Sequence, residues 1–186
     1  AGTHLANSLK QLEQLNIDSV AITGGGDLTV NLGAGGLDAI AGANLPSFDS
    51  GATVTLEMSA NDLLDANSNL LGADMASLAG AGIDHIQVDL AAPNFGTDLN
   101  TSLATSQGAL DSLFGSDATL LNQLMSAADA TNSHNLGNVR LEVGNNQDNA
   151  SPVHISDAHA NTLITEGLSF AAHDNIALDA DTTAGT

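Results

Sequence analysis

The sequence predicts an α/β or α+β fold, in which short helices and a mixed β-sheet form repeated layers, as in a solenoid-like repeat module. Helix-like and strand-like apolar spacings alternate along the chain, and one helix-to-strand unit occurs more than once. With no Trp or Tyr and only four Phe, small aliphatic residues must fill the core, and these suit thin layers. We treat residues 1–186 as one unit of a tandem array, with two subrepeats, about 1–92 and 93–186, as an alternative division.

The first helix-to-strand unit begins near the start of the chain. Four leucines have the spacing of an amphipathic helix over 4–15, with Thr3 as its candidate N-cap: Leu5, Leu9, Leu12 and Leu15. A strand is predicted directly afterwards, because Val20 and Ile22 alternate with small residues.

This unit recurs along the chain. The segment 75–88 superposes on 9–22 without a gap, and 168–178 is a weaker third copy. Each copy has an aspartate just before its strand, at Asp18, Asp84 and Asp174. The chain also begins and ends with the same tripeptide, Ala-Gly-Thr, as a tandem repeat would.

Further elements follow between these copies. The longest helical stretch, 103–130, is expected to break near Gly115. Apolar residues two apart predict strands at 27–32, 52–58, 139–143 and 153–155. Alternating strands and helices favour a parallel sheet, although 20–22 and 28–32 are close enough to form a hairpin instead.

The charge excludes some partners. Lys10 and Arg140 are the only strong bases against 22 acids, and the formal net charge is −20. Such a chain repels phosphate backbones and anionic membranes, so nucleic acid is not an expected partner. The carboxylates also repel one another, which destabilises the compact state unless salt or bound cations screen them.

Cysteine and hydropathy bear on the location of the protein. There is no cysteine, which removes disulfides, thiolate metal sites and thiol nucleophiles. Long bacterial surface proteins commonly avoid cysteine, so we expect an extracellular place at the bacterial cell surface. No run of about 18 apolar residues occurs, and we expect no membrane insertion.

The repeated unit, a short leucine- and alanine-rich helix leading into Ile-Asp-x-Ile/Val-x-Val/Ile, resembles the degenerate repeats of giant RTX-type secreted proteins and surface adhesins of Proteobacteria. The best matches are 12–22 and 78–89. The resemblance implies an extracellular, Asp-rich repeat array that tolerates or requires calcium. The Gly-Gly-x-Gly-x-Asp array typical of that family is missing, with one imperfect echo at 24–30.

Calcium is the candidate cofactor, because 18 of the 22 acids are aspartate and calcium prefers many oxygen ligands. Asp179 and Asp181 are two apart and would point to one side of a continuing strand. Further oxygens could come from Asp27 or from the repeated Asp18, Asp84 and Asp174. The alternative is that the repeated aspartates accept hydrogen bonds from backbone amides in the turns that lead into the strands.

Catalytic patterns are missing from the sequence. The six histidines form no His-Glu-x-x-His pair, and no Gly-x-Ser-x-Gly turn marks a nucleophile. We therefore predict no enzyme, but a self-associating structural repeat of a surface fibre, an S-layer-like coat or an adhesin stalk, whose partners are identical neighbouring copies. A calcium-dependent adhesive module is the alternative, and a secreted hydrolase domain ranks last. The sequence identifies no sugar or host-cell ligand.

Overall fold

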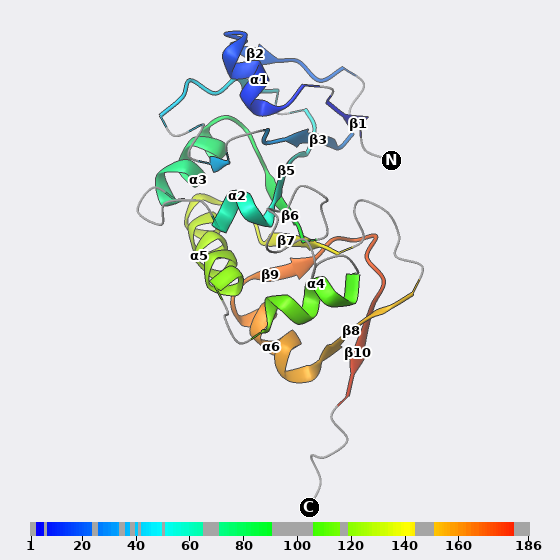
Figure 1. Cartoon of the computed structure of the whole chain (residues 1–186). Helices are drawn as coiled ribbons and strands as arrows, with labels where there is room; N and C mark the ends of the chain where they lie inside the picture. The colour runs from blue at the N-terminus through cyan, green and yellow to red at the C-terminus, as the bar shows by residue number, and fades with distance from the viewer. Residues whose placement is uncertain are drawn as a thin grey trace, which may run out of the picture.

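The fold is described from a computed structural model of the chain (Figure 1). The structure describes residues 3–5, 7–23, 26–33, 36–37, 40, 42–49, 51–64, 71–90, 106–115, 119–143 and 151–180.

One six-stranded sheet organises the molecule. Its strands lie in the order β1-β3-β5-β6-β7-β9, and every pairing is parallel. Each new strand is therefore added beside the one that precedes it in this sheet. The bounds are β1 (Thr3–His4), β3 (Leu28–Asn31), β5 (Val54–Ser59), β6 (His85–Asp89), β7 (Val139–Glu142) and β9 (Leu168–Phe170).

Two small parallel sheets accompany the large one. β2 (Ser19–Val20) pairs with β4 (Ser47–Phe48), and β8 (Val153–Ser156) pairs with β10 (Ile176–Asp179). The β2–β4 pair is also joined to the segment that connects α3 to β6, because the Phe48 N–H donates to the Ala81 carbonyl at 2.8 Å. Successive connections are thus joined by hydrogen bonds, as successive strands are.

Six helices connect these strands in the described part of the chain. Along one side of the large sheet in Figure 1 lie α2 (Ala60–Leu64), α3 (Leu71–Gly80) and α5 (Thr119–His134). Their apolar side chains form one core with those of the strands, made mostly of Leu, Val and Ile. The remaining helices are α1 (Leu9–Gln14), α4 (Ser106–Leu113) and α6 (Asp157–Thr165).

The helices pass into the following segments through a recurring turn. Asn16, Gly82 and Asn135 have φ of 52°, 88° and 61°, and the N–H of the next residue reaches back five positions into the helix. At α3 this bond joins the Ile83 N–H to the Leu78 carbonyl at 3.1 Å. Such a left-handed residue ends a helix and satisfies its last carbonyls, so the chain turns sharply into an extended segment.

Much of the predicted pattern is confirmed. The protein is α/β, with a parallel sheet and short helices, and strands occur at all four additional predicted positions. The predicted break after the first half of 103–130 is also present, between α4 and α5. The described strand pairings are all parallel, so the expectation of a mixed sheet and the hairpin alternative are wrong for these segments.

Two local predictions are also wrong. Thr3 lies in β1, and the first helix is instead capped by Ser8, whose side chain accepts from the Gln11 N–H while the Gln11 side chain accepts from the Ser8 N–H. The third sequence copy does not repeat the helix, because its first residues, 168–170, form β9. The first two copies also lead to different sheets, through β2 and β6.

Candidate functional site

The large sheet has an apolar face and a polar face, because side chains alternate along each strand. The apolar side chains, such as Leu56, Ile86 and Val139, join the core. The polar face carries two rows of residues in register across neighbouring strands. These rows are Asn31-Glu57-Gln87-Arg140-Ser169 and Ser59-Asp89-Glu142.

Several ionisable side chains on this polar face are buried. Glu142 is 0% exposed, Asp89 is 6% exposed and Glu57 is 7% exposed. Asp89 and Glu142 are partners in register at the carboxyl ends of β6 and β7. Buried carboxylates side by side favour a nearby positive charge or the protonation of one of them.

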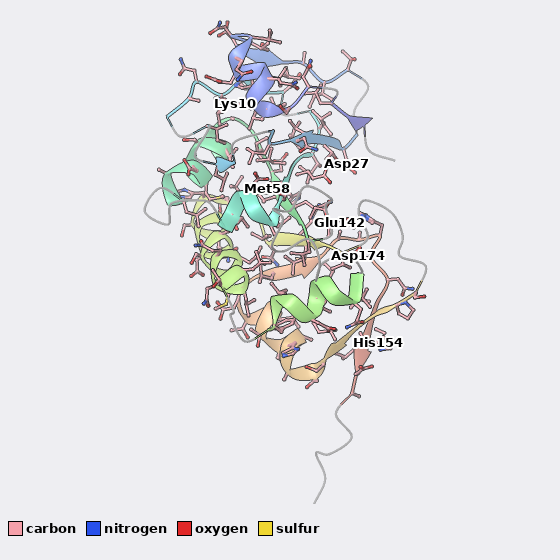
Figure 2. The ribbon with its side chains drawn as sticks, viewed as in Figure 1. Lys10, Asp27, Met58, Glu142, His154 and Asp174 are labelled. Atoms are coloured by element: carbon pink, nitrogen blue, oxygen red, sulfur yellow. The ribbon has the colours of Figure 1, made fainter. Side chains whose placement is uncertain are left out.

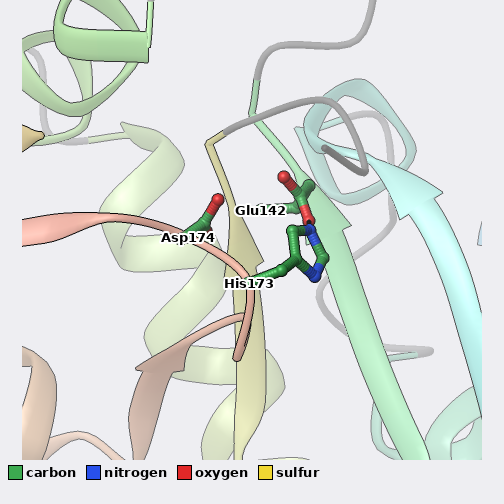
Figure 3. A group of neighbouring side chains, drawn as sticks. All are labelled: Glu142, His173 and Asp174. Carbon is green, nitrogen blue, oxygen red and sulfur yellow. Dashed lines mark ion pairs between the residues drawn. The ribbon is translucent and has the colours of Figure 1, made fainter. Parts of the chain in front are cut away.

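A compact cluster lies where β7 ends. His173, in the β9–β10 connection, forms an ion pair through Nε2 with the Glu142 Oε2 atom (Figure 3). Each of Glu142, His173 and Asp174 offers one ligand atom, and these atoms lie within 4.8 Å of one another. The His173 side chain is 35% exposed, but its Nε2 atom and the Glu142 side chain are buried, so the cluster lies just beneath the surface.

Neighbouring hydrogen bonds hold two carboxylates of this cluster in place. Asp174 Oδ2 accepts from the Val143 N–H at 3.1 Å, one residue beyond β7. Glu142 Oε2 accepts from the Gln87 side-chain amide on β6 at 3.4 Å. These contacts orient the donor atoms before any ligand arrives.

A second group of polar residues lies at the opposite end of the strands, where β3, β5, β6 and β7 begin. Asp27, Asp84, His85 and Asn135 line an open depression of about 570 Å³. Burial lowers the pKa of His85, and the Arg140 charge lowers it further, whereas the charge of Asp84 opposes them. The imidazole is therefore held toward its neutral form.

The predicted calcium ligands are distributed over separate places. Asp27 lines the depression and Asp174 lies in the cluster at the end of β7 (Figure 2). Asp84 also lines the depression, and Asp18 is exposed before β2. Asp179 lies on β10, where its Oδ1 is 2.8 Å from His154 Nδ1. Asp181 lies outside the described residues.

Two of the repeated aspartates accept hydrogen bonds from backbone amides. Asp84 Oδ2 accepts at 2.8 Å from the N–H of Val54, the first residue of β5, which agrees with the alternative interpretation. Asp174 Oδ2 accepts from Val143, which follows the end of β7 and is not in a turn that leads into a strand. At Asp18 it is the main-chain carbonyl that accepts, from the Ser47 N–H at 3.0 Å.

No sequence pattern indicates the cluster of Glu142, His173 and Asp174 as a unit. Asp174 stands out for its place in the repeated motif, whereas His173 is one of six scattered histidines. Glu142 is separated from His173 by 31 positions, and only the pairing of β7 with β9 brings them together. The feature of the sequence that points to Glu142 is its charge within the apolar strand pattern of 139–143.

None of the described helices has both the length and the apolar character needed to span a membrane. No protein-family model matches the chain, and comparison with curated proteins and with solved structures also gave no significant match.

Proposed function

We propose that this chain is a structural repeat module of an extracellular bacterial surface fibre, coat or adhesin stalk, and that it associates with neighbouring copies of itself. The consecutive order of the parallel strands supports this proposal. A sheet that adds one strand per turn is a solenoid-like stack, and further copies can continue such a stack at its two ends. Its acidic, cysteine-free composition suits the outside of a cell.

The distribution of exposed apolar side chains carries the proposal. Four large apolar side chains are exposed among the described residues: Leu15 at 63%, Ile17 at 37%, Ile164 at 74% and Leu178 at 56%. The first two lie between α1 and β2, and the other two lie in α6 and β10, at opposite ends of the molecule (Figure 1). Apolar side chains exposed at both ends of a stack suit an interface with the next copy.

The backbone at the two ends is complementary as well. β1 is the edge strand of the large sheet nearest the α1–β2 end, and β10, which pairs only with β8 among the described strands, lies at the other end (Figure 1). A parallel strand of a second copy, such as β10, can pair with the edge of β1, which would continue the sheet from one module to the next. This contact joins unlike ends, so it is heterologous, and it generates an open fibre when the rotation between copies does not close a ring.

The net charge limits the conditions under which copies associate. A charge of −20 on each copy opposes their approach, and this repulsion is screened by salt within about 10 Å at 0.1 M. Association is therefore expected to strengthen with ionic strength, as suits a protein exposed to sea water or to millimolar divalent ions.

Sedimentation velocity over a range of protein concentrations tests the proposal. The wild-type chain is expected to form larger species as concentration and salt rise. Leu178→Asp should abolish these species, whereas Ala76→Asp, at an exposed position on α3, which lies between the two ends (Figure 1), should not. A protein that stays monomeric at all concentrations, or variants that behave alike, would contradict the proposed stacking.

A calcium-dependent adhesive module is the second candidate, favoured by the open depression that Asp27, Asp84 and His85 line. Two carboxylates at the rim of one hollow could hold a calcium ion together with oxygens of a ligand. Calcium titration of Asp27→Asn against wild type distinguishes the two functions, because stacking does not require this residue.

A further inference from the structure

We infer that Glu142, His173 and Asp174 form a binding site for one divalent transition-metal ion, with zinc as the representative ion. The three ligand atoms lie within 4.8 Å of one another, and they come from two segments that the fold brings together. This inference does not depend on the proposed stacking, because all three residues belong to one copy.

The donor set decides the class of metal. Zinc and similar ions bind imidazole nitrogen and carboxylate oxygen at about 2.0–2.2 Å, which places tetrahedral ligand atoms roughly 3.4 Å apart. Small side-chain rotations bring three atoms within 4.8 Å to such a spacing. Calcium prefers six to eight oxygens, so an imidazole in the group favours a transition metal over calcium.

The buried carboxylates give a second reason to expect a metal ion here, independent of the donor set. Asp89 and Glu142, which are partners in register, are 6% and 0% exposed, and the Asp174 carboxylate lies close to that of Glu142. Neighbouring carboxylates are costly to ionise together in a buried place. A divalent cation bound to Glu142 and Asp174 would lower this cost.

Metal binding requires only a local change. His173 Nε2 faces Glu142 Oε2, and a metal ion held by both atoms would displace any proton on Nε2, which leaves to solvent. Nε2 is buried although the ring is 35% exposed, so the ion would enter as the imidazole rotates outward. Asp174 keeps its bond to the Val143 N–H through Oδ2 while the carboxylate contributes an oxygen to the ion.

The site would tie the last turn of the molecule to the body of the sheet. Glu142 ends β7, whereas His173 and Asp174 precede β10, which pairs only with β8 among the described strands. A metal that bridges these segments is expected to stabilise the β8–β10 sheet specifically.

Isothermal titration of the purified chain with zinc tests the inference, with magnesium present in excess to occupy nonspecific surface carboxylates. We expect one saturable site, and we expect cobalt to give the visible absorption of a tetrahedral complex. His173→Gln and Asp174→Asn should each weaken zinc binding at least tenfold. Gln is long enough to donate to Glu142 from about the place of Nε2 in the first variant, and Asn can still accept from Val143 in the second, so both variants should remain folded.

His154→Asn is the matched control, because this histidine also contacts a carboxylate, that of Asp179, but lies at a separate place on β8. Its zinc affinity should equal that of wild type. The inference is overturned by the absence of saturable zinc binding, by binding that survives in both cluster variants, or by binding that the control variant loses. Calcium binding stronger than zinc binding at this site would overturn the assigned metal class.

Discussion

Asp84 and the main chain of Val54 form two reciprocal hydrogen bonds, although the residues are 30 positions apart in the sequence. Asp84 Oδ2 accepts from the Val54 N–H at 2.8 Å, and the Asp84 N–H donates to the Val54 carbonyl at 2.9 Å. Val54 begins β5, and Asp84 immediately precedes β6. The aspartate of the repeated motif therefore fixes the register of two neighbouring strands where they start.

Replacing Asp84 by Ala is expected to destabilise the protein by about 1–2 kcal/mol, because the N–H of the buried Val54 loses its acceptor. Urea unfolding measures this loss. Asp18→Ala, at the equivalent position of the first copy, should cost less than about 0.5 kcal/mol, because its side chain is exposed. Equal losses in the two variants would contradict this role of Asp84.

Gly82→Ala is expected to destabilise the protein by more than about 1 kcal/mol. Gly82 has a φ of 88°, and a Cβ atom there would lie 3.0 Å from the Phe48 carbonyl oxygen. Gly72→Ala in α3 is the matched control, because a Cβ atom at Gly72 meets nothing within 4 Å. Alanine favours the helix, so Gly72→Ala should raise the melting temperature. A Gly82→Ala protein as stable as wild type would show that the turn tolerates a side chain.

Protonation of His85 is expected to destabilise the fold in acid. Burial and Arg140 lower the pKa of His85 from 6.5, so the unfolded chain binds a proton before the folded chain does. Stability from this group is therefore fully present above pH 6.5, the pKa in the unfolded chain, and is lost as the pH falls below 6.5 and through the lower pKa of the folded state. Melting curves between pH 7.5 and 5.5 should show a smaller loss in His85→Asn than in His134→Asn, a histidine at the end of α5. Parallel losses would exclude His85 as the source.

Calcium and magnesium at matched ionic strength are expected to raise the melting temperature equally, since both screen a net charge of −20. The carboxylates of Asp84 and Asp174 already bind backbone amides, and that of Asp179 contacts His154. A rise specific to calcium would instead support the predicted calcium ligands.

The class of fold could be predicted because apolar spacing records which strands and helices face the core. The start of the first helix could not, since Leu5 continues the helical spacing although it follows β1. The sequence Ser8-Leu-Lys-Gln11 was the usable signal, because it matches a capping box. Local alignment also could not assign strands to sheets: 9–22 and 75–88 match without a gap, yet β2 and β6 belong to different sheets.

The candidate metal cluster depends on long-range register, which no local pattern contains. Glu142 and His173 meet because β7 and β9 are neighbours and the chain turns back after Ala171, whose N–H donates to the Leu141 carbonyl at 2.8 Å. A buried acid in an apolar strand indicates that some partner exists, but the fold alone identifies it.

Mixing two variants, each altered at one end, tests the proposed stacking most directly. Leu15→Asp leaves only the α6–β10 end able to associate, and Leu178→Asp leaves only the α1–β2 end. Sedimentation velocity should find each variant monomeric alone and an equimolar mixture dimeric, because one intact end of each kind is then present. Dimers formed by either variant alone, or a mixture that remains monomeric under conditions in which the wild-type chain associates, would contradict head-to-tail stacking.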